Sequence, residues 1–143
     1  MKFSRSTELA IHGLWMLARK RPELLLISEM VEAQGASQSY LAKVFQRMAR
    51  SGLVNSTRGK RGGFTLARSP KSISIADVVR AIEADEPIYD CLHDRRGCKG
   101  NSDCMLRDAF FEVEKVMYTM LEKTSLADLL VGSEVPERSK WLG

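Results

Sequence analysis

Two short helical patterns separated by two residues constrain this chain more than any other feature. The first begins near Ser28, whose hydroxyl can cap exposed backbone amides, and ends at Gly35, which readily takes the left-handed conformation that stops a helix. The second begins at Ser37 and ends at Gly52. Its apolar residues recur on one helix face: Leu41, Val44, Phe45 and Met48. A short helix, a tight turn and a second helix predict a helix-turn-helix, whose second helix enters the major groove of DNA.

The outer face of the second helix carries hydrogen-bonding and cationic side chains near its N-terminal end. Helices of this kind contact base edges through their first turns. We expect four residues to face the major groove: Gln38, Ser39, Tyr40 and Lys43. Many small helical cores have the same apolar spacing, so this pattern alone leaves a purely structural helix pair open.

Two short apolar runs flank a basic, glycine-rich loop. Leu53-Val54 and residues 64–66 predict two strands. The loop between them offers three cations and three glycines: Arg58, Gly59, Lys60, Arg61, Gly62 and Gly63. Glycines permit a tight reversal, and the cations suit phosphates or an adjacent minor groove. A nucleotide-binding loop would instead show GxxxxGK[ST] before a helix, so we expect a β-wing beside the helix-turn-helix.

The distribution of charge supports a polyanionic partner. Residues 1–75 contain 13 Lys and Arg against 4 Asp and Glu, a net charge of +9, whereas residues 76–143 contain 9 against 14, a net charge of −5. A localised positive field favours DNA because neutralising phosphates releases condensed counterions. From charge alone, a solvated basic surface is the alternative.

The N-terminal residues have a superficial likeness to a signal peptide. Lys2 and Arg5 precede an apolar helical pattern from about Ser6 to Arg19, but Glu8 and His12 interrupt it. Basic residues also stand where a small-residue cleavage site would be needed. No apolar run approaches the roughly 20 residues that cross a bilayer. We therefore expect an ordinary helix here, in a cytoplasmic protein that does not contact membranes.

The second half of the chain is organised around an aperiodic segment. Ser74 and Asp77 fit a capping box that opens a helix through about Glu83, and a stronger helix runs from Met105 to about Glu122. The apolar residues of this stronger helix predict a coiled-coil-like seam for dimerisation: Leu106, Phe110, Val113, Met117 and Met120. Another short helix begins near Ser125.

The expected fold is therefore mostly α-helical with a small β-wing. Its parts are a winged helix-turn-helix domain, a cysteine loop, a long dimerisation helix with a short C-terminal helix, and a tail: residues 1–83, 84–104, 105–131 and 132–143.

Three cysteines lie in or at the end of the aperiodic segment. Cys91, Cys98 and Cys104 form C-x6-C-x5-C, and the chain has no fourth cysteine. An odd count argues against a closed set of disulfides, while thiolates suit zinc or iron–sulfur clusters. The spacing is wider than in structural zinc sites, and a reduced loop without metal stays open. Only His12 and His93 are available for a catalytic constellation, so we expect no enzyme.

On these residues the chain resembles the bacterial winged-helix iron–sulfur transcription regulators that include IscR, NsrR and RirA. The resemblance implies a homodimer that recognises a palindromic operator in double-stranded DNA, with a cluster held by Cys91, Cys98 and Cys104. Its recognisable stretches are residues 39–44, 52–54, 58–67, 75–83 and the three-cysteine loop.

The resemblance is closest to the NsrR-like type. IscR-like members use a histidine three residues after the last cysteine, where this chain has Arg107. NsrR-like members take a carboxylate from the first helix of the partner subunit, and the matching position is Glu8. His12 is the alternative ligand, and His93 has no counterpart in either pattern. The missing histidine favours a 4Fe-4S cluster, while Glu8 with His12 leaves a 2Fe-2S cluster open.

The sequence therefore predicts a homodimeric DNA-binding transcription regulator that senses nitric oxide, redox state or iron through an iron–sulfur cluster. The alternative is a winged-helix regulator without a cluster, which responds through its thiols or to another signal.

Overall fold

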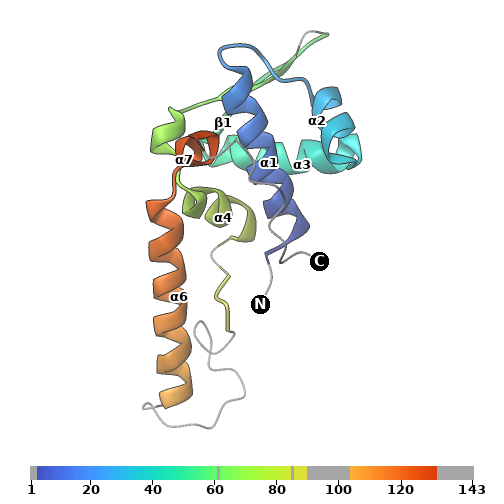
Figure 1. Cartoon of the computed structure of the whole chain (residues 1–143). Coiled ribbons are helices and arrows are strands. Elements are labelled where there is room, and N and C mark those ends of the chain that lie inside the picture. Colours follow the sequence, from blue (N-terminus) through green and yellow to red (C-terminus); the bar gives the residue numbers. More distant parts are fainter. Residues whose placement is uncertain (1–2, 61, 85, 90–103, 132–143) are drawn as a thin grey trace, which may run out of the picture.

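The structure is a computed structural model of the 143-residue chain and describes residues 3–60, 62–84, 86–89 and 104–131. As predicted, it is mostly helical with one small antiparallel sheet. Figure 1 shows α6 extending away from the other helices. Among the described residues, no helix is both long enough and apolar enough to span a membrane. In chain order the elements are α1 (Arg5–Lys20), α2 (Ile27–Gln34), α3 (Gln38–Arg50), β1 (Val54–Thr57), β2 (Gly63–Leu66), η1 (Pro70–Ser72), α4 (Ile75–Glu83), α6 (Met105–Lys123) and α7 (Leu126–Val131).

The core lies between α1, α3, α4 and α7. Their apolar faces supply fully buried side chains, and the helical spacing of the sequence placed them on one side of each helix. The largest include Leu14, Leu17, Leu41, Phe45, Met48, Val78 and Leu126. Although α7 follows the long α6 in sequence, it packs against α1 and η1. Leu126 N–H donates to the Ile73 carbonyl over 2.8 Å, which fixes α7 in this core.

The two helices of the helix-turn-helix begin in different ways. Ser37 caps α3 as predicted, accepting a hydrogen bond from the Tyr40 N–H. The cap predicted at Ser28 is wrong, because α2 starts at Ile27 and Ser28 lies inside it. The Glu29 carboxylate instead accepts from the Leu26 N–H over 2.8 Å. An acidic side chain in the first turn thus satisfies the amide of the N-cap residue, Leu26, while among the described residues no side chain caps the later amides that the serine hydroxyl was expected to bind.

A glycine sets the distance between α1 and α3. A Cβ atom on Gly13 would lie 2.4 Å from Cζ of Phe45, closer than a side chain tolerates. Phe45 is fully buried, and its ring packs against that of Phe64 in β2 with centroids 4.7 Å apart. Gly13 therefore lets one aromatic pair join α1, α3 and the wing.

The wing is a longer hairpin than the sequence predicted. Strand β1 runs four residues from Val54, and β2 pairs with it so that Val54 faces Leu66 and Thr57 faces Gly63. Phe64 also exchanges two backbone hydrogen bonds with Leu25, which precedes α2. A Cβ on Gly63 would lie 2.6 Å from the Leu25 carbonyl oxygen, so only glycine permits this contact. The wing is thereby tied to the start of the helix-turn-helix.

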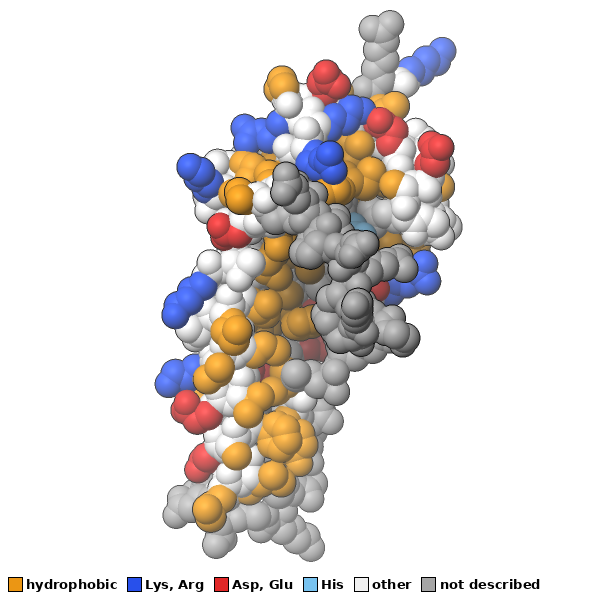
Figure 2. Space-filling view, viewed as in Figure 1, with side chains coloured by type: hydrophobic (Ala, Val, Ile, Leu, Met, Phe, Trp, Pro, Cys, Tyr) orange, Lys and Arg blue, Asp and Glu red, His pale blue; other side chains and the backbone are white. Residues whose placement is uncertain are grey.

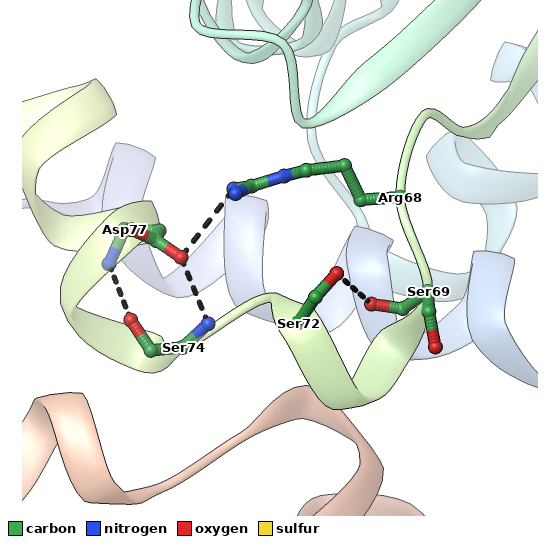
Figure 3. A network of polar contacts seen from close by, with 5 residues as sticks. All are labelled: Arg68, Ser69, Ser72, Ser74 and Asp77. Atoms are coloured by element: carbon green, nitrogen blue, oxygen red, sulfur yellow. Dashed lines mark hydrogen bonds and ion pairs between the residues drawn. The ribbon is translucent and has the colours of Figure 1, made fainter.

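The capping box predicted at the start of α4 is confirmed. Ser74 accepts from the Asp77 N–H, and the Asp77 carboxylate accepts from the Ser74 N–H over 3.0 Å. Figure 3 shows Arg68, from the segment after the wing, reaching the same carboxylate. These contacts connect the end of the wing to α4, which packs on both α1 and α3.

Candidate functional site

The outer side of α3 presents the four residues predicted to face the major groove. We call these residues the reading face: Gln38, Ser39, Tyr40 and Lys43. All four are exposed, while the opposite side of α3 is buried in the core. The capping of α3 by Ser37 leaves the reading face on its first two turns. Side chains there can reach base edges without any loss of core packing.

One member of the reading face has a partner that the sequence did not indicate. The Tyr40 hydroxyl lies 2.7 Å from the Ser6 hydroxyl of α1, within hydrogen-bonding distance. Tyr40 is 37% exposed, so its ring remains at the surface. The start of α1 and the start of α3 are thus joined by a side-chain hydrogen bond, a contact across 34 residues of sequence.

The tip of the wing presents cations on a glycine turn. Arg58 and Lys60 are exposed, whereas Arg61 lies outside the described residues. Gly59 has a φ of 114°, and Gly62 N–H donates to its carbonyl over 2.9 Å. A Cβ on Gly62 would lie 2.4 Å from the Thr57 carbonyl oxygen. The glycines are therefore required by the turn itself, and they bring the cations to the end of the hairpin.

Glu8 and His12, the two ligands predicted on the first helix, line the same open cavity between α1 and the end of α2. We call it the Glu8 cavity; its volume is about 550 Å³. The other lining residues are Arg5, Leu9, Ala33 and Gln34. Glu8 and His12 are both exposed, one helical turn apart on α1. The cavity thus offers an oxygen ligand, a nitrogen ligand and a cation at a surface next to the turn of the helix-turn-helix.

The three predicted cysteine ligands are not all within the described residues. Cys91 and Cys98 lie outside them, as does His93. Cys104 is the N-cap residue of α6, partly exposed and with a free thiol. In the described part of the chain, no three His, Cys, Asp or Glu residues are grouped closely enough to hold a metal ion. The full ligand set therefore stays a prediction.

The residues on either side of the cysteine segment are anchored on α6. Tyr89 stacks on Phe110 with ring centroids 4.6 Å apart. Ile88 N–H donates to the Glu114 carboxylate over 2.9 Å, and Cys104 begins the helix itself. The residues just before the cysteine segment therefore contact the N-terminal half of α6, and the residue at the end of the segment begins that helix.

A partly buried contact links the end of α4, before the cysteine segment, to α1. Glu83, at the end of α4, accepts hydrogen bonds from the Ser4 N–H over 2.8 Å and from the Thr7 hydroxyl. Burial by itself raises the pKa of Glu83, but the hydrogen bonds from Thr7 and Ser4 outweigh it, so the pKa lies below its ordinary value. An ionised Glu83 therefore holds the N-terminal end of α1 against α4.

No residue of α6 is buried, although the helix is 19 residues long. The seam predicted from the sequence is partly wrong: Phe110 packs on Tyr89 and Met117 faces the chain's own α4 side. The exposed apolar residues keep Leu106, Val113 and Met120 of the predicted seam and continue through Ala109 and Val116, again at spacings of three and four. We call this line the α6 stripe: Leu106, Ala109, Val113, Val116 and Met120. Figure 2 shows hydrophobic side chains along this elongated part of the molecule.

The similarity of this chain to known proteins covers nearly all of the elements described above. A family profile described as Rrf2, an iron-dependent transcriptional regulator, matches residues 3–132. The chain is 32% identical over 136 residues to the transcriptional regulator NsrR of Bacillus subtilis, covering 94% of this chain and 93% of that protein. The solved structure of T. potens IscR superposes with a TM-score of 0.77 at 25% identity, over 98% of this chain and 93% of that one. The solved structure of CymR, the global cysteine regulator of B. subtilis, superposes with a TM-score of 0.76 at 23% identity, over 92% of this chain and 97% of that one. This similarity shows a shared fold.

Proposed function

Because this chain belongs to the Rrf2 family of transcription regulators, we propose that it works as a homodimer which binds a palindromic operator and senses its signal through an iron–sulfur cluster. The family membership confirms the resemblance found in the sequence, and its members are DNA-binding regulators with a winged helix-turn-helix, not enzymes. Dimerisation, the operator's symmetry and the cluster are the parts that we propose.

The observation that carries the proposal is the position of Glu8 and His12 in a cavity beside the helix-turn-helix. Ala33 and Gln34, which line the same cavity, directly precede the turn at Gly35. A ligand held by Glu8 would therefore contact the unit that positions the recognition helix. The Ser6–Tyr40 hydrogen bond gives α1 a second connection to α3.

For DNA contact, we propose that the reading face enters the major groove while the wing lies along the adjacent backbone or minor groove. Lys43 and Tyr40 offer a cation and a hydroxyl close to the start of α3, where base edges are reached. Arg58 and Lys60, together with Arg61, would contact phosphates and contribute affinity without sequence preference.

For dimerisation, we propose that two copies pair through the α6 stripe. Val116 and Met120 expose 57% and 66% of their surface, an unusual state for apolar residues in the middle and last turns of a long helix. A stripe with alternating spacings of three and four is the geometry that two helices bury against each other. Pairing would give the two recognition helices the two-fold symmetry of a palindromic operator.

The donor chemistry of the chain fits an iron–sulfur cluster. Cys91, Cys98 and Cys104 would supply three thiolates, and Glu8 of the partner subunit would supply the fourth ligand, with His12 as the alternative. Arg5 in the same cavity would offset the negative charge of such a group. We favour 4Fe-4S, with 2Fe-2S possible. Bound there, the cluster would supply a centre that reacts with nitric oxide or oxidants, or is lost under iron shortage.

Loss of that ligand bond would release α1. Glu8 and Ser6 lie in the first turns of α1, and Ser6 contacts Tyr40 of the recognition helix. With Glu8 no longer bound to the cluster, this end of α1 would change how firmly Tyr40 is held, and with it the spacing of the two recognition helices.

The experiment is anaerobic purification of the full chain followed by visible absorption and by iron and sulfide analysis. We expect a coloured protein whose affinity for its operator, selected from a library of random duplexes, changes on exposure to nitric oxide, oxidant or chelator. Glu8→Gln should weaken iron retention, whereas Glu23→Gln, an exposed carboxylate in the loop after α1, should not. A colourless, iron-free protein that binds its operator equally in all conditions would contradict the cluster.

Such a result would favour a regulator that acts without a cluster. The free, partly exposed thiol of Cys104 is the observation in support of this second candidate. Alkylation of the reduced protein, followed by operator binding, distinguishes it, because only a thiol-based regulator would lose its response when thiols are blocked and iron is absent.

A further inference from the structure

Gln34, the last residue of α2, buries a polar group that none of the described residues satisfies. Both polar atoms of its carboxamide, Nε2 and Oε1, are buried and have no hydrogen-bond partner in the part of the chain that the structure describes. Buried amides in native proteins are nearly always hydrogen-bonded, because leaving one unpaired opposes folding. A residue that violates this rule at the wall of a cavity indicates that a partner belongs there.

The surroundings of Gln34 identify which cavity it serves. Gln34 lines the Glu8 cavity together with Glu8 and His12. Its Nε2 lies 3.6 Å from the point that a Cβ on Gly13 would occupy, so the carboxamide is tucked against α1 next to His12.

We propose that Gln34 is a ligand-contacting residue of the Glu8 cavity, donating a hydrogen bond from its carboxamide to the group that Glu8 and His12 receive. In naming this group an iron–sulfur cluster, the inference rests on the proposed function. The sulfides and thiolates of such a cluster accept hydrogen bonds, and Nε2 of a carboxamide has two to donate. Glu8 and Gln34 thus have different tasks, because the carboxylate can bind iron while the amide contacts sulfur.

The place of Gln34 in the chain gives this contact a consequence. It is followed directly by Gly35, whose left-handed φ of 62° and N–H bond to the Val31 carbonyl end α2. The helix-turn-helix turn therefore begins one residue after a side chain that senses whether the cavity is filled. Gln34 provides a route from the cavity to α3 that is separate from the Ser6–Tyr40 contact.

The test replaces the carboxamide by an apolar group of similar size, in Gln34→Met and Gln34→Leu. In the iron-free protein we expect the melting temperature to rise by about 3 °C, because an unpaired buried amide has been removed. In the anaerobically loaded protein we expect loss of iron to a chelator about tenfold faster than in the wild type, and a more negative reduction potential of the cluster. Gln46→Met, at an exposed glutamine of α3, is the matched control and should change neither property.

The opposite signs of these effects separate a ligand contact from a structural one. If both variants lower the melting temperature of the iron-free protein, Gln34 has a structural role and the inference is wrong. If both retain iron at the wild-type rate with an unchanged potential, the hydrogen bond to the cluster does not exist. A wild-type protein that binds no iron at all would instead contradict the proposed function, and the inference with it.

Discussion

The Tyr40 hydroxyl lies 2.7 Å from the Ser6 hydroxyl, so a residue of the reading face is hydrogen-bonded to the helix that carries Glu8. This contact is at the surface, where a single hydrogen bond contributes about 1 kcal/mol or less to stability. We therefore expect this hydrogen bond to matter for the coupling between α1 and α3 more than for the stability of the fold.

We expect Tyr40→Phe to reduce the difference in operator affinity between the loaded and the iron-free protein. Ser6→Ala should have the same effect, and the double variant should have no larger one, because both remove the same bond. Operator binding measured by fluorescence anisotropy in both states gives this double-mutant cycle. Additive effects of the two substitutions would show that the bond does not couple α1 to α3.

The wing cations should act through phosphate charge. Arg58→Gln is expected to weaken binding to specific and random duplexes alike, and to reduce the slope of log affinity against log salt by about 1. Lys123→Gln, at the end of α6, removes the same charge far from the wing in sequence and should leave the slope unchanged. A specific loss at one operator position would mean that Arg58 contacts a base.

Gly13→Ala tests the close approach of α1 and α3. In an exposed helix this change stabilises by up to about 1 kcal/mol, but here the added methyl meets the Phe45 ring, and we expect a net loss of about 2 kcal/mol. Urea denaturation gives the free energy of unfolding. In a Phe45→Leu background the ring is gone, so Gly13→Ala should cost less or nothing.

The contact between Thr7 and Glu83 predicts that the stability of the folded protein decreases at acidic pH. The pKa of the Glu83 carboxyl in the folded protein lies below its ordinary value of 4.5. The stabilising effect of the ionised carboxylate is therefore complete above that pH and is lost as the pH falls through the folded pKa. Thr7→Val removes a hydrogen bond to the carboxylate and should make the urea midpoint fall less steeply below pH 5. Thr119→Val, whose exposed hydroxyl donates to a backbone carbonyl, is the control and should retain the wild-type profile.

If two copies pair through the α6 stripe, a charge placed on the stripe should prevent dimerisation, whereas the same charge beside it should not. Val116→Asp should produce monomers in sedimentation velocity, because the charge would be buried in the helix pair. Lys115→Asp places the same side chain about 100° around the helix and should leave the dimer intact. A dimer that survives Val116→Asp would require a different interface.

Local chemistry made much of this fold predictable from the sequence. Ser37, Gly35 and Ser74 end or begin helices through bonds to nearby amides, and such contacts can be inferred from a few residues. The cap predicted at Ser28 is wrong because α2 begins one residue earlier, at Ile27, where the Glu29 carboxylate binds the Leu26 N–H and also contacts Lys20.

Contacts between distant residues were not predictable in the same way. Nothing in the sequence pairs Ser6 with Tyr40, or leaves Gln34 without a partner, because both facts depend on how α1 crosses the helix-turn-helix. On α6 the apolar spacing fits two overlapping lines, which share Leu106, Val113 and Met120 and differ in the residues between them. Packing of Phe110 on Tyr89 decided which line remained exposed.

The burial of Leu126 beneath the DNA-binding helices bears on the order in which the protein is made. Its side chain is 1% exposed, and its N–H is bonded to Ile73, so the core is incomplete until α7 has been synthesised. A nascent chain that has emerged only as far as the wing lacks this side chain. The core of the DNA-binding unit is therefore incomplete until the cysteine segment and α6, which precede α7 in the chain, have been translated.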